Sequence, residues 1–125
     1  MCARQQPAPG LAIISPVVPT LYGDADPALA PDLEASMTPH AYAAFETKAP
    51  APAWADSGFA GRRGYIRTLD DACNPSFLQD MWIKKSGVEW EMVDFQTSHG
   101  PFISQPQKVA ETAVRFAEKF MALGN

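Results

Sequence analysis

The sequence predicts an α/β fold with a mostly parallel sheet, and three observations support this prediction. After Gly64, short segments rich in β-branched and aromatic residues alternate with segments whose apolar residues recur at helical spacing. Their order is strand, helix, strand, loop, helix, which is typical of a parallel sheet covered by helices. Before that point, six of the twelve prolines lie within residues 1–32, where each removes a backbone donor and disfavours long helices and central strands.

Size and composition indicate one folded unit. A chain of 125 residues is long enough for one hydrophobic core and too short for two. Its 46% apolar and 19% charged residues are ordinary for a globular protein. We therefore expect one structural unit with two parts, a Pro- and Ala-rich N-terminal segment over residues 1–63 and an α/β segment over residues 64–125.

Charge and cysteine content argue against several classes of function. The net charge is −4, and the one dense basic cluster, Arg62 and Arg63, is too small to bind nucleic acid. Cys2 and Cys73 make neither a disulfide framework nor a zinc-binding spacing, which favours a reducing compartment. Prolines interrupt the longest apolar run, which is much shorter than the roughly 20 residues of a membrane span. We expect a cytoplasmic protein without nucleic-acid partner, membrane contact, cofactor or metal.

Local signals predict one helix and one connector in the first half. Thr38 can cap a helix over about residues 39–46, because a first helical turn accepts Pro39. Residues 49–54 then alternate Ala and Pro before an aromatic anchor, Trp54, which predicts a stiff connector.

The second half begins with a predicted strand and helix. Residues 65–69 favour a strand that ends at the acidic turn Asp70–Asp71. Asn74 and Pro75 then provide the cap and first turn of a helix that runs to about Lys85.

A second strand and a long final helix follow. Residues 88–92 alternate apolar and acidic side chains, as a strand with one solvated face does. Ser104 and Gln107 have the spacing of a capping box for the final helix. Two strands alone do not make a stable parallel sheet. Either the first half contributes more sheet than its prolines suggest, or a second copy of the chain or another partner completes it.

Two chemically useful side chains follow the two predicted strands. Asp71 comes after the first and His99 after the second. Neighbouring parallel strands would place both residues at the same sheet edge, where ligands bind in open α/β sheets. The carboxylate could then hold one imidazole nitrogen and leave the other to move protons. A lone histidine would more often be an ordinary loop residue, but the matched acid favours a catalytic pair.

The residues around this pair also form a longer pattern, which resembles the end of small α/β-hydrolases. The group is that of the plant hydroxynitrile lyases and salicylate-methyl-ester esterases, with fungal and bacterial relatives. Residues 21–54 resemble the cap region of the same family more loosely. The matching motifs are Tyr65-Ile66-Arg67-Thr68-Leu69-Asp70-Asp71, Asn74-Pro75, Gln79, Met81, Ser86-Gly87-Val88, His99 and Ser104-Gln105-Pro106-Gln107-Lys108.

The resemblance implies a partial α/β-hydrolase fold, with a cap-like segment before the strand–helix–strand–helix part. The family pattern selects Asp71 over Asp70 as the catalytic acid, four residues before the Pro and eight before the Gln, and it places the catalytic histidine at His99. Trp54, in the cap-like segment, and Phe102, beside the histidine, are candidates to line an apolar substrate pocket.

The family's nucleophile is not found. These enzymes use a serine on a G-x-S-x-G turn in the first half of the fold. None of the seven serines has glycine on both sides at that spacing. The sequence therefore predicts the acid–base part of the site without the nucleophile-bearing half.

Three interpretations of function remain open. The first is an enzyme of esterase lineage that acts on a small apolar ester or carbonyl-containing metabolite, and without serine the pair could still serve a lyase, decarboxylase or cyclase. The second is a truncated product of a longer hydrolase. The third is a non-catalytic module that binds a small ligand or a partner protein.

Overall fold

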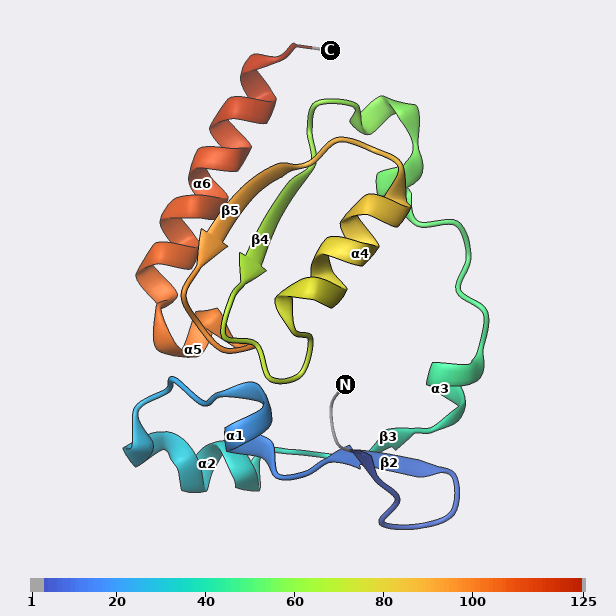
Figure 1. The fold of residues 1–125 in the computed structure, drawn as a ribbon, viewed down its shortest axis with the longest axis vertical. Coiled ribbons are helices and arrows are strands. Elements are labelled where there is room, and N and C mark those ends of the chain that lie inside the picture. Colours follow the sequence, from blue (N-terminus) through green and yellow to red (C-terminus); the bar gives the residue numbers. More distant parts are fainter. Residues whose placement is uncertain (1–3, 125) are drawn as a thin grey trace.

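The computed structural model describes residues 4–124, and its larger part is an α/β sandwich. Two parallel strands, β4 (Gly64–Thr68) and β5 (Glu91–Phe95), lie between helices α4 (Ser76–Ser86) and α6 (Pro106–Ala122) (Figure 1). The strands run side by side in register from one end to the other. The predicted strand–helix–strand–helix order is therefore the order observed.

Alternating side chains of the strands face the two helices. On one face, Gly64 lies so close to the ring of Phe116 that an added Cβ would approach it to 2.6 Å. On the other face, Arg67 of β4 reaches Asp80 of α4, with 2.6 Å between Nη1 and Oδ1. Because side chains alternate along a strand, α6 covers one face of the sheet and α4 the other.

The N-terminal segment forms a second, smaller antiparallel sheet and several short helices. Strand β2 (Leu11–Ile14) lies between β1 (Arg4–Gln5) and β3 (His40–Ala41). Short strands thus form between prolines, although the proline content had argued against central strands. The remaining elements are α1 (Val17–Leu21), η1 (Pro27–Leu29), α2 (Ala30–Ala35), α3 (Ala43–Glu46), η2 (Ala53–Ala55), η3 (Ser57–Phe59) and α5 (Pro101–Ser104).

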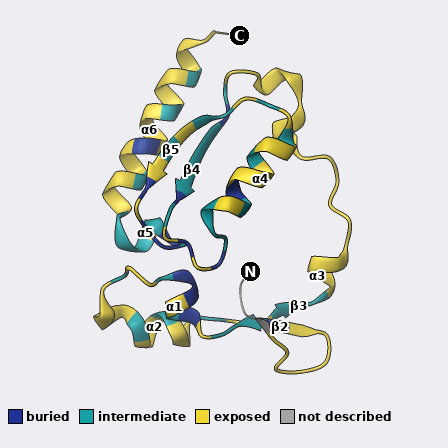
Figure 2. Cartoon of the chain, viewed as in Figure 1, coloured by how far each residue is buried: buried dark blue, intermediate teal, exposed yellow. Residues whose placement is uncertain are grey.

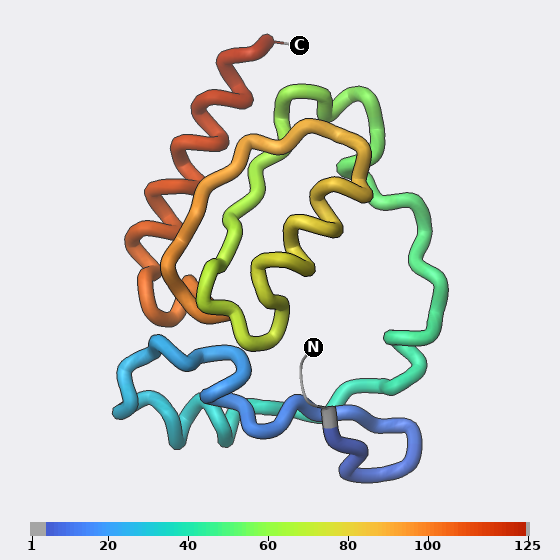
Figure 3. Tube along the Cα trace, viewed as in Figure 1, coloured from blue at the N-terminus to red at the C-terminus, as the bar shows by residue number. Residues whose placement is uncertain are grey.

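This N-terminal segment lies across the carboxyl ends of β4 and β5. The trace then runs along one side of the molecule to the opposite end of the strands (Figure 3). Contact at the carboxyl ends is direct, since the Gly100 amide donates to the carbonyl of Leu21 at 2.9 Å. Val17 and Leu21 also bury their side chains against Cys73, in the loop after β4. The two parts of the chain meet at the ends of the strands.

Few apolar side chains are buried for a chain of this size. Figure 2 shows both α4 and α6 largely exposed, with the buried positions concentrated near the ends of the strands. The accessible surface is 8273 Å², whereas a folded monomer of 13.6 kDa usually exposes about 6,600 Å². The buried apolar residues among those described are Ala12, Val17, Leu21, Cys73 and Phe95.

Three local predictions differ from the structure. Residues 40–41 form strand β3, and the helix expected from Pro39 begins only at Ala43, because pairing with β2 holds the chain extended there. The second strand begins at Glu91 and not at Val88, because the hydroxyl of Ser86 accepts from Val88 N and from Trp90 Nε1 and ties those residues to the end of α4.

The predicted capping box is the third difference. Helix α6 begins at Pro106 with Gln105 as its N-cap, and no side chain caps it. Ser104 ends the preceding short helix α5, and its hydroxyl is buried without a partner among the described residues. Gln107 instead donates to Glu111, one turn further along. Proline at the first helical position sets the start of the helix here.

Two further expectations concern cysteine and the membrane. Cys73 is buried and disulfide-bonded, which corrects the expectation that the cysteines are reduced. Cys2 lies outside the described residues. Within residues 4–124, no helix is long and apolar enough to cross a membrane.

Candidate active site

The predicted acid and base meet at the carboxyl ends of the parallel strands. Asp71 follows β4 by three residues and His99 follows β5 by four, so parallel pairing brings their loops together. The Nδ1 atom of His99 lies 2.9 Å from Oδ2 of Asp71. Asp70 points elsewhere and accepts a hydrogen bond from Gln96 at 2.6 Å. The structure thus places Asp71, and not its neighbour, beside the histidine.

Asp71 is buried and fully hydrogen-bonded. Its side chain is 2% exposed. Oδ1 accepts from the amides of Cys73 and Asn74, at 2.8 and 2.7 Å. Oδ2 accepts from the Thr68 hydroxyl at 2.9 Å and faces His99. Four donors stabilise the ionised carboxylate in this buried position, because each satisfies one of its lone-pair sites.

His99 is more open than its partner. Its side chain is 37% exposed, so one edge of the ring meets the buried acid and the rest reaches the surface. An ionised carboxylate can only accept a hydrogen bond. In the neutral imidazole, the proton is therefore on Nδ1 and is donated to Asp71. The other nitrogen, Nε2, is then an acceptor at the open side of the site. This arrangement can take up a proton and return it.

The loop that carries His99 is attached to the N-terminal segment on both sides of the histidine. The Ser98 hydroxyl lies between the Asp24 carboxylate and the carbonyl of Leu21, with 3.1 Å between Oγ and Leu21 O. On the other side, Gly100 packs on the ring of Tyr22, where an added Cβ would approach ring carbons to 2.6 Å. Only glycine allows this contact without a shift of the aromatic ring. The N-terminal segment therefore helps to hold the histidine in place.

The contact with Ser98 changes the pKa of the Asp24 carboxyl group. Partial burial raises the pKa of Asp24, but the hydrogen bonds from Ser98 outweigh burial and leave the pKa below its ordinary value of 3.8. Asp24 had no distinct sequence signal, because its partners are more than 70 residues away along the chain.

Of the two predicted pocket residues, Trp54 is not brought together with the pair. Trp54 contacts the start of β4, where its carbonyl accepts from Arg63 Nε at 2.6 Å, and it packs against Trp90 with ring centroids 5.7 Å apart. A five-residue strand, about 16 Å long, separates this end of the sheet from His99. Phe102 is close to His99 in sequence, but it is 58% exposed on α5.

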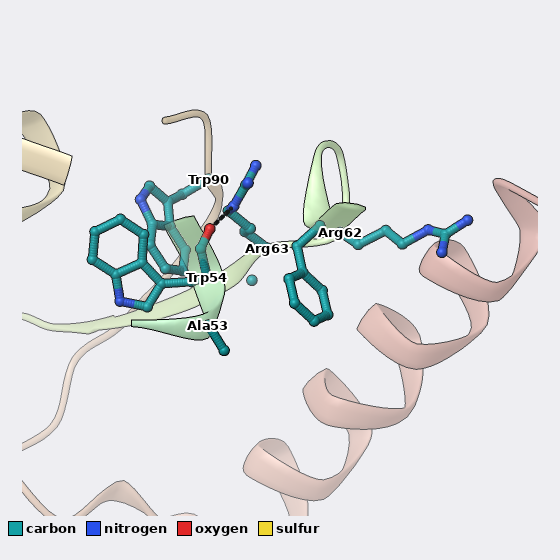
Figure 4. Close-up of a pocket in the computed structure, with 7 residues that line it drawn as sticks. Ala53, Trp54, Arg62, Arg63 and Trp90 are labelled. Carbon is teal, nitrogen blue, oxygen red and sulfur yellow. Dashed lines mark hydrogen bonds between the residues drawn. The ribbon is translucent and has the colours of Figure 1, made fainter. Parts of the chain in front are cut away.

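Trp54 lines a cavity of its own, of about 250 Å³. Figure 4 shows Trp54, Ala53 and Trp90 on one side of it, with the side chain of Arg62 extending away towards a helix. Residues in the cavity wall are Ala53, Trp54, Phe59, Arg62, Arg63, Gly64 and Trp90. Within residues 4–124, no group of three His, Cys, Asp or Glu side chains is placed to hold a metal ion.

Comparison with known proteins agrees with this architecture. The crystal structure of polyneuridine aldehyde esterase superposes on the chain with a TM-score of 0.70 and 17% sequence identity, over 94% of this chain. The fold is α/β-hydrolase-like. The chain spans 48% of the length of that esterase. No family model matches the sequence, and no curated protein matches it.

The α/β-hydrolase-like fold confirms the fold class predicted from the strand and helix pattern, while the assignment to the hydroxynitrile lyase and methyl-ester esterase group remains a prediction. Gln79, which entered the sequence analysis only as a motif position, has a larger structural role than expected. It is 2% exposed and hydrogen-bonded to three residues near the acid, Tyr65 and Thr68 of β4 and Asn74 of the following loop. Its burial could not be read from apolar periodicity, because Phe77 in the same turn is 68% exposed.

Proposed function

We propose that the chain carries the acid–base pair of an α/β-hydrolase-type site that acts on a small apolar ester or a carbonyl-containing metabolite. The observation that supports this most directly is the 2.9 Å contact between a buried carboxylate and a partly exposed imidazole at the carboxyl ends of parallel strands. A carboxylate held away from water and a ring open to it suit proton transfer to a bound ligand. No cofactor or metal enters this proposal.

In the proposed mechanism, Asp71 fixes the orientation of His99 and stabilises the imidazolium that forms during the reaction. His99 Nε2 removes a proton from a nucleophile or from the substrate and later returns it to the leaving group. An acyl transfer reaction also needs a nucleophile. Ser98, the serine next to His99, does not fit this role, because its hydroxyl is engaged by Leu21 and Asp24.

The nucleophile in this proposal comes from a polypeptide segment outside the described residues, whether in the same chain of a longer hydrolase or in a partner. Without it, the pair can serve reactions that need only proton transfer, such as those of a lyase, decarboxylase or cyclase.

Turnover of three substrate classes by the purified chain tests the proposal. The substrates are aryl esters, cyanohydrins and β-keto acids, and the variants are His99→Gln, Asp71→Asn and the control His40→Gln. His40 is a histidine distant from the pair, in β3, with its ring against Phe45. We expect His99→Gln to lower any turnover by about 10²- to 10⁴-fold, the usual contribution of a general acid or base, and His40→Gln to leave it unchanged. Equal turnover by wild type and His99→Gln would refute the catalytic role.

A second function, a binding module without chemistry, is favoured by the amount of exposed apolar surface. On α4, Phe77 is 68% and Trp82 45% exposed, and on α6, Met121 is 73% exposed. Surfaces of this kind suit a small ligand, a second copy of the chain or another protein that extends the sheet. Calorimetric binding of the same compounds with no turnover, and no effect of His99→Gln, would favour this function over the first.

A further inference from the structure

We propose that Gln79 is a positioning residue that sets the proton arrangement of the Asp71/His99 pair through the hydroxyl of Thr68. The inference rests on the proposed function of the pair and adds a residue that acts on it without touching it. Gln79 lies in the first turn of α4, buried against the last residue of β4. Its amide connects α4, the end of β4 and the loop that carries the acid.

The hydrogen bonds of Gln79 fix which way its amide points. Oε1 accepts from the Thr68 amide at 3.2 Å and from the Tyr65 hydroxyl at 3.4 Å. Nε2 donates to the carbonyls of Thr68 and Asn74, at 2.8 and 2.7 Å. A flipped amide would set a donor against the Thr68 N–H and an acceptor against two carbonyls. One orientation alone is therefore compatible with these neighbours.

The amide orientation in turn fixes the direction of the Thr68 hydroxyl. Nε2 of Gln79 also lies 3.2 Å from Thr68 Oγ1. An amide nitrogen can only donate, so Oγ1 accepts on that side, and the two amide hydrogens are shared among three acceptors. The single hydroxyl proton of Thr68 then points to the other neighbour, Oδ2 of Asp71, at 2.9 Å. Without Gln79, this hydroxyl could rotate away from the acid.

Gln79 also holds the acid loop from its far side. The Asn74 carbonyl accepts from Gln79, and the Asn74 amide donates to Asp71 Oδ1. Both oxygens of the acid are thus held by groups that Gln79 positions, Thr68 at Oδ2 and Asn74 at Oδ1. The one remaining lone-pair site of Oδ2 faces His99 Nδ1. A single buried amide therefore determines how the carboxylate presents itself to the imidazole.

The tautomer of His99 reports this effect directly and needs no enzyme assay. The ¹⁵N chemical shifts of the two ring nitrogens give the ratio of Nδ1–H to Nε2–H imidazole, measured where the ring is neutral and well below the unfolding temperature. We expect Nδ1–H to dominate in the wild type. Gln79→Met and Thr68→Val, both near-isosteric and non-hydrogen-bonding, should raise the ratio by up to about tenfold, because Oδ2 without the Thr68 donor accepts more strongly from Nδ1–H, while Thr68→Ser should retain it.

The matched control is Gln107→Met, the same chemical change on the exposed surface of α6, which should leave the ratio unchanged. A Gln79→Met protein that is folded by its amide spectrum but keeps the wild-type ratio would overturn the proposal. So would a Gln79→Met/Thr68→Val double variant whose effect is the product of the two single effects, because a shared pathway requires non-additivity. If Gln79→Met does not fold, Thr68→Val against Thr68→Ser decides the question.

This outcome is separable from the fate of the proposed function. A tautomer ratio that follows Gln79, in a protein with no turnover, supports the positioning role and counts against catalysis by the chain alone. Turnover that depends on His99, together with a tautomer ratio that Gln79→Met does not change, supports the proposed function and counts against the positioning role of Gln79.

Discussion

At the residue scale, the candidate site depends on hydrogen bonds between segments that are far apart in sequence. Asp71 is satisfied within its own loop and by Thr68, so the acid needs only local structure. His99 is different, because the residues on both sides of it contact the N-terminal segment at Leu21 and Tyr22. Displacement of that segment would free the base while leaving the acid in place.

The Asp24 carboxylate should make stability depend on pH at this junction. Its pKa is lowered in the folded chain, so its contribution to stability is present above about pH 4 and is lost as the pH falls through the folded-state value. We expect Asp24→Asn to reduce the loss of stability between pH 5 and pH 2, measured by urea unfolding. Parallel pH curves for wild type and Asp24→Asn would contradict the assignment.

At the element scale, β4 pairs with β5 along one edge, and no strand within residues 4–124 pairs with its other, open edge. The carbonyl of Arg63 accepts from Glu91, and the amide of Leu69 donates to Phe95. Because backbone groups alternate in direction along a strand, the N–H and C=O groups of Tyr65 and Arg67 also point towards β5. Gly64, Ile66 and Thr68 therefore direct their N–H and C=O groups to the other side. Gln79 satisfies those of Thr68, and the groups of Gly64 and Ile66 remain available to another strand.

Amide hydrogen exchange along β4 should show this alternation. We expect the amides of Tyr65 and Arg67 to be protected and those of Gly64 and Ile66 to exchange faster, with Thr68 protected by Gln79. Gln79→Met should remove the protection of Thr68 specifically. Uniform protection from Gly64 to Ile66 in the isolated chain would show that the open edge is covered, by a second copy or by another segment.

The contact between β4 and α6 gives a second prediction at this scale. An added Cβ at Gly64 would meet the ring of Phe116 at 2.6 Å, so Gly64→Ala should destabilise the chain by about 1–3 kcal/mol. Gly23→Ala, whose Cβ would meet its nearest neighbour at 3.6 Å, is the control. Combination with Phe116→Ala should remove the extra cost of Gly64→Ala in urea unfolding. An additive double variant would place the strain elsewhere.

At the scale of the whole molecule, the exposed surface exceeds what is usual for the chain's mass by about a quarter. Two strands covered by one helix on each face leave most of each helix in solvent, since a wider sheet is needed to bury it. The apolar side chains of α4 and α6 therefore remain exposed although the sheet itself is regular. The same shortage of strands leaves the β4 edge open.

Association should consequently stabilise the isolated chain. We expect its apparent Tm to rise with protein concentration, as for any species that binds the folded state, and sedimentation to show larger species over the same range. Addition of a polypeptide that supplies the missing strands should raise Tm further. A monomer whose Tm is the same across a hundredfold range of concentration would mean that the exposed surface has no self-affinity.

The sequence by itself determined the order and type of the elements after Gly64, and the positions of Asp71 and His99 behind two parallel strands. These features follow from local signals, namely β-propensity, helix-starting residues and the side-chain period. The second strand begins later than its alternation predicts because of a local contact, since the Ser86 hydroxyl accepts from Val88 N and Trp90 Nε1. Tertiary structure placed Trp54 at the far end of the sheet and made Gln79 and Asp24 partners of the site. The contacts of Trp54, Gln79 and Asp24 join separate elements of the fold, so no local pattern encodes them.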